Sequence, residues 1–203
     1  FLASKPDSLF DMLVANPPYV RHHHIENDTK VRLQDAIHRT TGIRISGLAG
    51  LYCYFMMLSM SWLREGGLSC WLVPSEFMDV NYGEAVKQYL MKNVQLVRIH
   101  RFKADDLQFA DALVSSCIVI FRNSKPTPSE AIEFSIGGSI NNPEVIKTID
   151  REQLKPKDKW TNLFTDDFKS DEPQATLGDF FNVKRGIATG DNDFFIIDQE
   201  TID

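Results

Sequence analysis

The stretch FDMLVANPPY, residues 10–19, decides the fold of this 203-residue chain. An apolar run of strand length, without helical periodicity, ends at an Asn, two prolines and a Tyr, which predicts a buried parallel strand. Pro17 and Pro18 exclude both helix and central-strand geometry, so the chain must turn at the carboxyl end of that strand. In open α/β sheets, ligands bind at this end of the strands.

The residue types of this bend favour binding of an amino group. Pro17 and Pro18 have no N–H, so the bend offers carbonyl oxygens and few donors, and Asn16 adds a side-chain amide oxygen. Hydrogen bonds from an exocyclic amine to Asn16 and to the Pro17 carbonyl would favour a tetrahedral nitrogen whose lone pair faces an electrophile. No strong general base is required, because the proton leaves after the nitrogen has become cationic. Tyr19 would supply an aromatic face on which a base stacks.

Asn16-Pro17-Pro18-Tyr19 after an apolar strand resembles the catalytic motif of S-adenosylmethionine-dependent adenine-N6 DNA methyltransferases, as found in restriction-modification systems. Later segments resemble the same family in their order: an apolar helix, a Gly-Gly pair, a strand ending at Pro74, and a Phe five residues ahead of a Val-Ser pair, Phe109 before 114–115. Residues 176–195 resemble the opening of the family's target-recognition domain.

The resemblance implies a set of site residues and a methyl donor. Asn16, Pro17, Pro18 and Tyr19 would be catalytic; Tyr19 and Phe109 would stack on an extruded adenine; Phe1, Asn16 and Pro18 would contact the cofactor, S-adenosyl-L-methionine. From the residues alone, Phe1 can equally be a loop side chain packed on the core, and Phe109 can plug its loop into the core.

The expected elements predict an α/β fold: the C-terminal half of a Rossmann-like methyltransferase domain, with a parallel sheet ending in an antiparallel strand pair at 94–102 and 113–121. Helices are expected at 26–38, 47–67 and 84–92, the second one ended by Gly66-Gly67. Residues 1–125 would be a partial catalytic domain, 126–175 a polar connector, and 176–203 the start of a target-recognition domain. Because no glycine-rich cofactor loop is present, we expect a fragment that is inactive on its own.

The charge distribution bears on the partner. The net charge of −6 argues against a nucleic-acid binder, but residues 21–44 carry five Lys/Arg against three acids, together with four His. Arg21, Arg44, Lys184, Arg185 and Thr189 are the predicted contacts to double-stranded DNA. The parent chain could also carry or partner a restriction endonuclease.

Cysteine and hydropathy patterns indicate the compartment. Cys53, Cys70 and Cys117 lie in apolar runs, which predicts reduced, buried thiols in a cytoplasmic protein. No signal peptide and no membrane-spanning run of about 18 apolar residues is seen, so no membrane partner is expected. Three consecutive histidines, 22–24, cannot converge on one metal ion from a helix or a strand.

Two other functions remain open at this point. A protein-glutamine or RNA methyltransferase can use the same acceptor loop, although the basic insertion after Tyr19 and the 176–197 segment speak against it. The second alternative hypothesis is a non-catalytic DNA-binding or subunit-contact module. An assay of methyl transfer to DNA and to a glutamine peptide would distinguish these functions. Transfer to the peptide and none to DNA would contradict the DNA methyltransferase.

Overall fold

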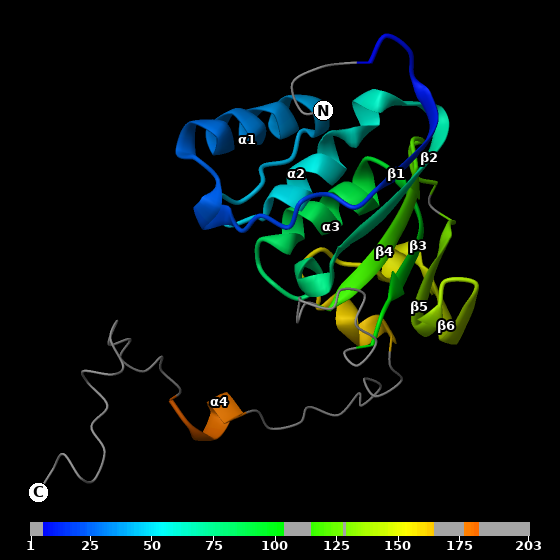
Figure 1. The fold of residues 1–203 in the computed structure, drawn as a ribbon. Helices are drawn as coiled ribbons and strands as arrows, with labels where there is room; N and C mark the ends of the chain where they lie inside the picture. The colour runs from blue at the N-terminus through cyan, green and yellow to red at the C-terminus, as the bar shows by residue number, and fades with distance from the viewer. Residues whose placement is uncertain (1–5, 104–114, 128, 165–176, 183–203) are drawn as a thin grey trace, which may run out of the picture. The chain divides into compact units, whose positions relative to one another are not determined.

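The computed structural model describes residues 6–103, 115–127, 129–164 and 177–182. Its centre is a mixed six-stranded sheet in the order β1-β2-β4-β3-β5-β6 (Figure 1). β1 pairs parallel with β2, β4 runs antiparallel to both β2 and β3, β5 is parallel to β3, and β6 is antiparallel to β5. The predicted α/β class with an antiparallel strand pair is confirmed. The strands are β1 Phe10–Ala15, β2 Leu63–Pro74, β3 Gln95–Arg101, β4 Ser116–Arg122, β5 Ala131–Ser139 and β6 Asn142–Asp150.

Helices cover one face of this sheet. α2 (Leu51–Leu58) and α3 (Gly83–Lys92) lie along it, and α1 (Asn27–Thr41) packs against α2 (Figure 1). The register places one row of side chains under the helices: Ala15 is opposite Trp71, then Val119, Ile99 and Phe134 follow across the strands. Four of these five side chains, from Trp71 onward, are at most 1% exposed. This row is the centre of the core, and it sets β1 and β2 side by side.

The helix expected over 47–67 is shorter than predicted. α2 ends at Leu58 and continues as a 3-10 turn, η2 (Ser59–Trp62), after which β2 begins at Leu63. Gly66 and Gly67 therefore lie inside β2 and do not end a helix. Gly66 has φ 74°, and a Cβ on Gly67 would stand 3.2 Å from the Asp11 carbonyl oxygen. The glycines are needed where residues 64–67 of β2 bulge opposite a single β1 residue.

β1 is not the buried strand that its apolar sequence predicts. None of its residues is buried: the first three are exposed, and only Leu13 and Ala15 are intermediate. Phe10, Met12 and Val14 are 46%, 58% and 72% exposed. The reason is topological, because β1 is an edge strand among the described residues and pairs there with β2 alone. A continuous apolar run matches a strand covered on both faces, whereas here the helices cover one.

The segment after β4 contributes to the sheet, which corrects its interpretation as a connector with weak strand signals. β5 and β6 form a hairpin that joins the sheet beside β3. Two 3-10 turns follow, η4 (Arg151–Gln153) and η5 (Trp160–Phe164), and the Trp160 and Phe164 rings pack edge-on against Phe134. Lys87 of α3 fixes this segment, since its Nζ donates to the Asp158 carbonyl at 2.7 Å.

A second unit, residues 169–203, is described over 177–182 and contains the short helix α4 (Leu177–Phe180). Phe180 and Phe181 are 70% and 64% exposed. Within the described parts of the chain, no helix is long and apolar enough to cross a bilayer. The thiols of Cys53 and Cys117 are buried and that of Cys70 is half-buried, and all three are free.

Candidate active site

The bend at residues 16–19 opens on a cavity. β1 ends at Ala15, as predicted. The chain then turns at the end of the sheet where the parallel strands β1 and β2 have their carboxyl ends. Asn16 and Pro18 are exposed, and Pro17 between them is buried. The cavity measures about 440 Å³; besides β1 and the bend it is lined by three aromatic side chains, Phe55, Trp62 and Trp71.

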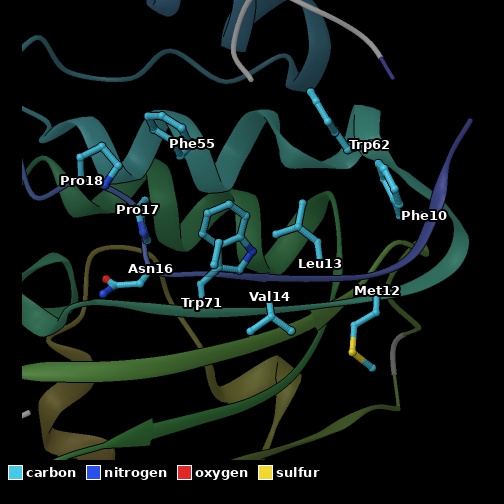
Figure 2. Close-up of a pocket in the computed structure, with 11 residues that line it drawn as sticks. Phe10, Met12, Leu13, Val14, Asn16, Pro17, Pro18, Phe55, Trp62 and Trp71 are labelled. Atoms are coloured by element: carbon cyan, nitrogen blue, oxygen red, sulfur yellow. The ribbon is translucent and has the colours of Figure 1, made fainter. Parts of the chain in front are cut away.

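Figure 2 shows how these groups are arranged. Asn16 lies at the end of β1 with its amide directed away from the packed rings, while Trp71 and Leu13 rise from the strands toward α2. Val14 and Met12 point to the opposite side of the sheet. Asn16 is exposed and not packed in hydrocarbon, so its amide oxygen is accessible as an acceptor. That accessibility is the condition on which the predicted amine-binding role depends.

Tyr19 is held between the ends of the two strands. Its hydroxyl donates to the carbonyl oxygen of Leu72 in β2 at 3.1 Å. Its ring meets that of Tyr52 edge-on, with centroids 6.5 Å apart and planes at 72°. Burial raises the pKa of the Tyr19 phenol to about 12, so the hydroxyl stays protonated and remains a donor at neutral pH. The ring is thus fixed in orientation while one part of it stays accessible.

A hydrogen-bonded chain that sequence reasoning missed extends from Tyr52. The Tyr52 hydroxyl lies 3.3 Å from that of Tyr82, and the Tyr82 hydroxyl donates to Oε1 of Glu76. Tyr52 is 2% exposed, and burial raises its pKa well above the usual value. Glu76 belongs to η3 (Ser75–Met78), which directly follows β2. Its place just after Pro74, at a strand's carboxyl end, is the signal that could have identified it.

The other predicted residues are distributed as follows. Arg21 and Arg44 are both exposed, and they line two different cavities, neither of which is the one beside Asn16. The three histidines form the 3-10 turn η1 (His22–His24). Five predicted residues lie outside the described part of the chain: Phe1, Phe109, Lys184, Arg185 and Thr189.

The described residues flanking Phe109 locate the ends of its segment. Phe102 donates its N–H to the Ser116 carbonyl at 3.1 Å, and Ser75 donates to the Ser115 carbonyl at 2.8 Å. Ser116 pairs with Pro74, the last residue of β2. Both ends of the chain segment between β3 and β4 are therefore anchored near the carboxyl ends of β2 and β3, which is also the end of the sheet where the bend lies.

Solved structures share this fold. A putative class I S-adenosylmethionine-dependent methyltransferase of Listeria monocytogenes is similar to 71% of this chain, which covers 42% of that protein, with a TM-score of 0.51 at 19% identity. The type IIG restriction endonuclease BpuSI is similar over 75% of this chain and 21% of its own, with a TM-score of 0.56 at 20% identity. The architecture is that of a class I methyltransferase domain.

The sequence comparisons specify the family. The model of the Eco57I restriction-modification methylase family matches residues 1–109, more than half of the chain. The chain belongs to this family of restriction-modification methyltransferases. It is 28% identical over 202 residues to the type II methyltransferase M.AccI of Acinetobacter calcoaceticus, an alignment that covers 92% of this chain and 36% of that protein. The chain thus spans about a third of the length of the curated relative.

Proposed function

We propose that the longer protein to which this sequence corresponds methylates the exocyclic amine of adenine in double-stranded DNA. The observation that carries the proposal is the Asn16 amide, which stands exposed at the end of a parallel strand, beside the Pro17 carbonyl and a cavity with aromatic walls. An amine inside a stacked duplex cannot reach a methyl donor, so the target base is extruded into the site.

The residues of the bend have distinct roles in this proposal. The Asn16 amide oxygen and the Pro17 carbonyl accept the two amine hydrogens, which keeps the nitrogen lone pair off the purine ring and directs it to the methyl carbon. Tyr19 offers its ring to the base, where stacking replaces about 1–3 kcal/mol lost on extrusion. Its bond to Leu72 keeps that ring in place. Proximity and orientation then account for much of the rate.

S-adenosyl-L-methionine supplies the methyl group when it is bound. The cavity suits such a ligand in one respect: its walls are apolar and aromatic (Phe55, Trp62 and Trp71), and Asn16 provides a polar group at the rim. Asn16 and Pro18 both line it and are the described residues proposed to hold the donor; Phe1 is the third. After transfer, the nitrogen carries an extra proton, which passes to water.

The remaining proposals concern the DNA and the rest of the protein. Phe109 would close on the face of the adenine opposite Tyr19, since its segment is anchored at the same end of the sheet. Residues 176–203 would begin a target-recognition domain in which Lys184, Arg185 and Thr189 contact phosphate, with Arg21 and Arg44 as further contacts. The similarity to BpuSI supports a fused or partner restriction endonuclease. We expect the enzyme in the cytoplasm, with its DNA.

Product analysis tests the activity. The full-length protein is incubated with S-adenosyl-L-methionine labelled in its methyl group and, in parallel reactions, with duplex DNA, RNA or a glutamine-containing protein substrate, and the nucleic acids are digested to nucleosides. We expect the label in N6-methyl-2′-deoxyadenosine from the DNA. Label on glutamine of a protein substrate, or on RNA alone, would contradict the proposed acceptor and favour the other methyltransferase classes.

A further inference from the structure

A second cavity lies beside the bend and has no role in the methyl transfer described above. It measures about 390 Å³, within the range of small-ligand sites. One wall comes from the chain that follows Tyr19, another from the turn before α2, and the third from the chain after β2. The lining residues that carry the argument are Arg21, His22, Leu48, Glu76, Asn81 and Tyr82.

The carboxylate in this cavity is held in one orientation. Tyr82 donates its hydroxyl to Oε1 of Glu76 and is itself in contact with the buried hydroxyl of Tyr52. An ionised carboxylate accepts about four hydrogen bonds. Within the described residues, no hydrogen bond to its other oxygen, Oε2, is present. Glu76 therefore offers an oriented acceptor to a ligand that brings an N–H group.

The wall formed by the chain after Tyr19 provides positive charge. Arg21 is exposed, and it forms no ion pair with any carboxylate in the described part of the chain. His22 stands next to it, and Leu48, which is 58% exposed, adds an apolar surface. A cation, an apolar surface and an oriented acceptor correspond to the three parts of a nucleotide: its phosphate, the flat face of its base and an amino group on the base edge.

The chain that leads from the bend to the second cavity is held by backbone contacts. Leu51 donates its N–H to the Val20 carbonyl at 2.9 Å, which fixes the chain just after the bend. Gly50, which lines the cavity, is closely packed, because a Cβ there would stand 3.1 Å from the Tyr52 ring and 3.4 Å from the Val20 carbonyl oxygen. Val20 and Arg21 directly follow the bend in sequence, so a DNA strand that inserts one base beside Asn16 can carry its next nucleotide past them.

We propose that this cavity binds the nucleotide adjacent to the target base, with its phosphate on Arg21 and a base amino group on Glu76. The inference rests on the proposed function, since it places a DNA strand across the bend. It assigns part of the sequence preference to the catalytic domain itself. A carboxylate discriminates a base that presents an amino group from one that does not, by about tenfold or more.

Base analogues test the contact to Glu76 in the full-length protein. Each neighbour of the methylated adenine is replaced in turn by an analogue without the exocyclic amino group, such as hypoxanthine for guanine or 2-pyrimidinone for cytosine. For the unmodified protein, we expect kcat/KM to fall about tenfold or more at one position. Glu76→Met, which removes both acceptor oxygens at similar side-chain length, should show that loss on the natural duplex, with no further loss on the analogue.

Matched variants show whether a loss of activity comes from Glu76 itself or from a general effect of the substitution. Glu65→Met, which replaces an exposed carboxylate near the start of β2 and outside the cavity, should keep the full sensitivity to the analogue. Tyr82→Phe leaves the carboxylate in place without its tether, so an intermediate loss is expected. Arg21→Gln should weaken DNA binding and lower the slope of log Kd against log salt by about one. Arg64→Gln, which removes an exposed cation paired with Asp11 near the amino end of β1, should not.

Two results would overturn the proposal: no neighbouring position that responds to loss of an amino group, or an analogue effect that is as large in Glu76→Met as in the unmodified protein. The outcomes also distinguish the proposed nucleotide site from the proposed methyl transfer. Adenine methylation without any dependence on a neighbouring amino group rejects the second cavity as a nucleotide site and leaves the activity intact. A protein that neither methylates nor binds DNA rejects both.

Discussion

The two faces of the sheet differ sharply in how they are covered. Under the helices, Trp71, Val119 and Phe134 are at most 1% exposed. Successive residues of a strand point to opposite faces, so the neighbours of this row lie on the other side of the sheet. There, Val14 is 72% exposed and pairs in register with the half-buried Cys70. The opposite face is apolar along β1, β2 and β4, but where β3 and β5 pair it carries Arg98, His100, Glu133 and Ser135. His100 and Ser135 are fully buried there, so the contrast between the faces is greatest at β1 and β2. Because the buried row of large apolar side chains lies under the helices, we expect the helix-covered face to contribute most of the stability of this chain.

Thiol labelling gives the largest contrast between the faces. Cys117 lies in the helix-covered row beside Val73, and Cys70 lies on the opposite face. Burial raises the pKa of all three thiols, and that of Cys53 reaches about 12. Cys53 and Cys117 should therefore react only after opening of the core, at least about 10³-fold more slowly than Cys70. Mass spectrometry of peptides after timed alkylation measures the three rates, and equal rates would refute the one-sided core.

Truncating the core tryptophan should produce the largest change in stability. Trp71→Ala removes a fully buried ring from the central row, and we expect the free energy of unfolding to fall by about 3–5 kcal/mol. Urea denaturation followed by circular dichroism measures it. A decrease in the free energy of unfolding of less than about 1 kcal/mol would mean that the helix-covered face does not form the core of this chain.

The matched change on the uncovered face should have almost no effect. Val14→Ala alters a side chain that is 72% exposed, so the free energy of unfolding of this chain should change by less than about 0.5 kcal/mol. The same denaturation experiment applies. If Val14→Ala is as destabilising as a buried substitution, this face is covered in solution and the comparison fails.

The local sequence predicted those parts of the fold that depend on local signals. The apolar run before Asn16, the turn at Pro17 and the helix up to Asn93 follow from residue type and spacing, and the structure confirms them. β1 was assigned as buried because its run is apolar throughout, yet burial depends on which strands pair beside it. No short window of sequence contains that pairing.

The other elements that differ from the prediction do so for similar reasons. An apolar stretch suggested one long helix to Gly67, but the chain switches to β2 at Leu63, where pairing with β1 outweighs helix propensity. The strands β5 and β6 were missed because Gly137 and Gly138 resemble a linker, whereas their positive φ values belong to an irregular strand end. At the bend, the motif predicts roles for Asn16 and Tyr19. The contact of Tyr82 with Glu76 exists only in the folded chain.

The most direct test of the account compares two substitutions of Asn16 in the full-length protein. Asn16→Ala removes the side-chain acceptor, and Asn16→Asp keeps an acceptor oxygen at the same place. With DNA binding monitored as a control, we predict that Asn16→Ala lowers the single-turnover rate of methyl transfer by on the order of 10²–10³-fold, that Asn16→Asp retains more of it, and that both bind DNA equally. A methyl-transfer rate for Asn16→Ala close to that of the unmodified protein would contradict the claim that this bend holds and activates an amine.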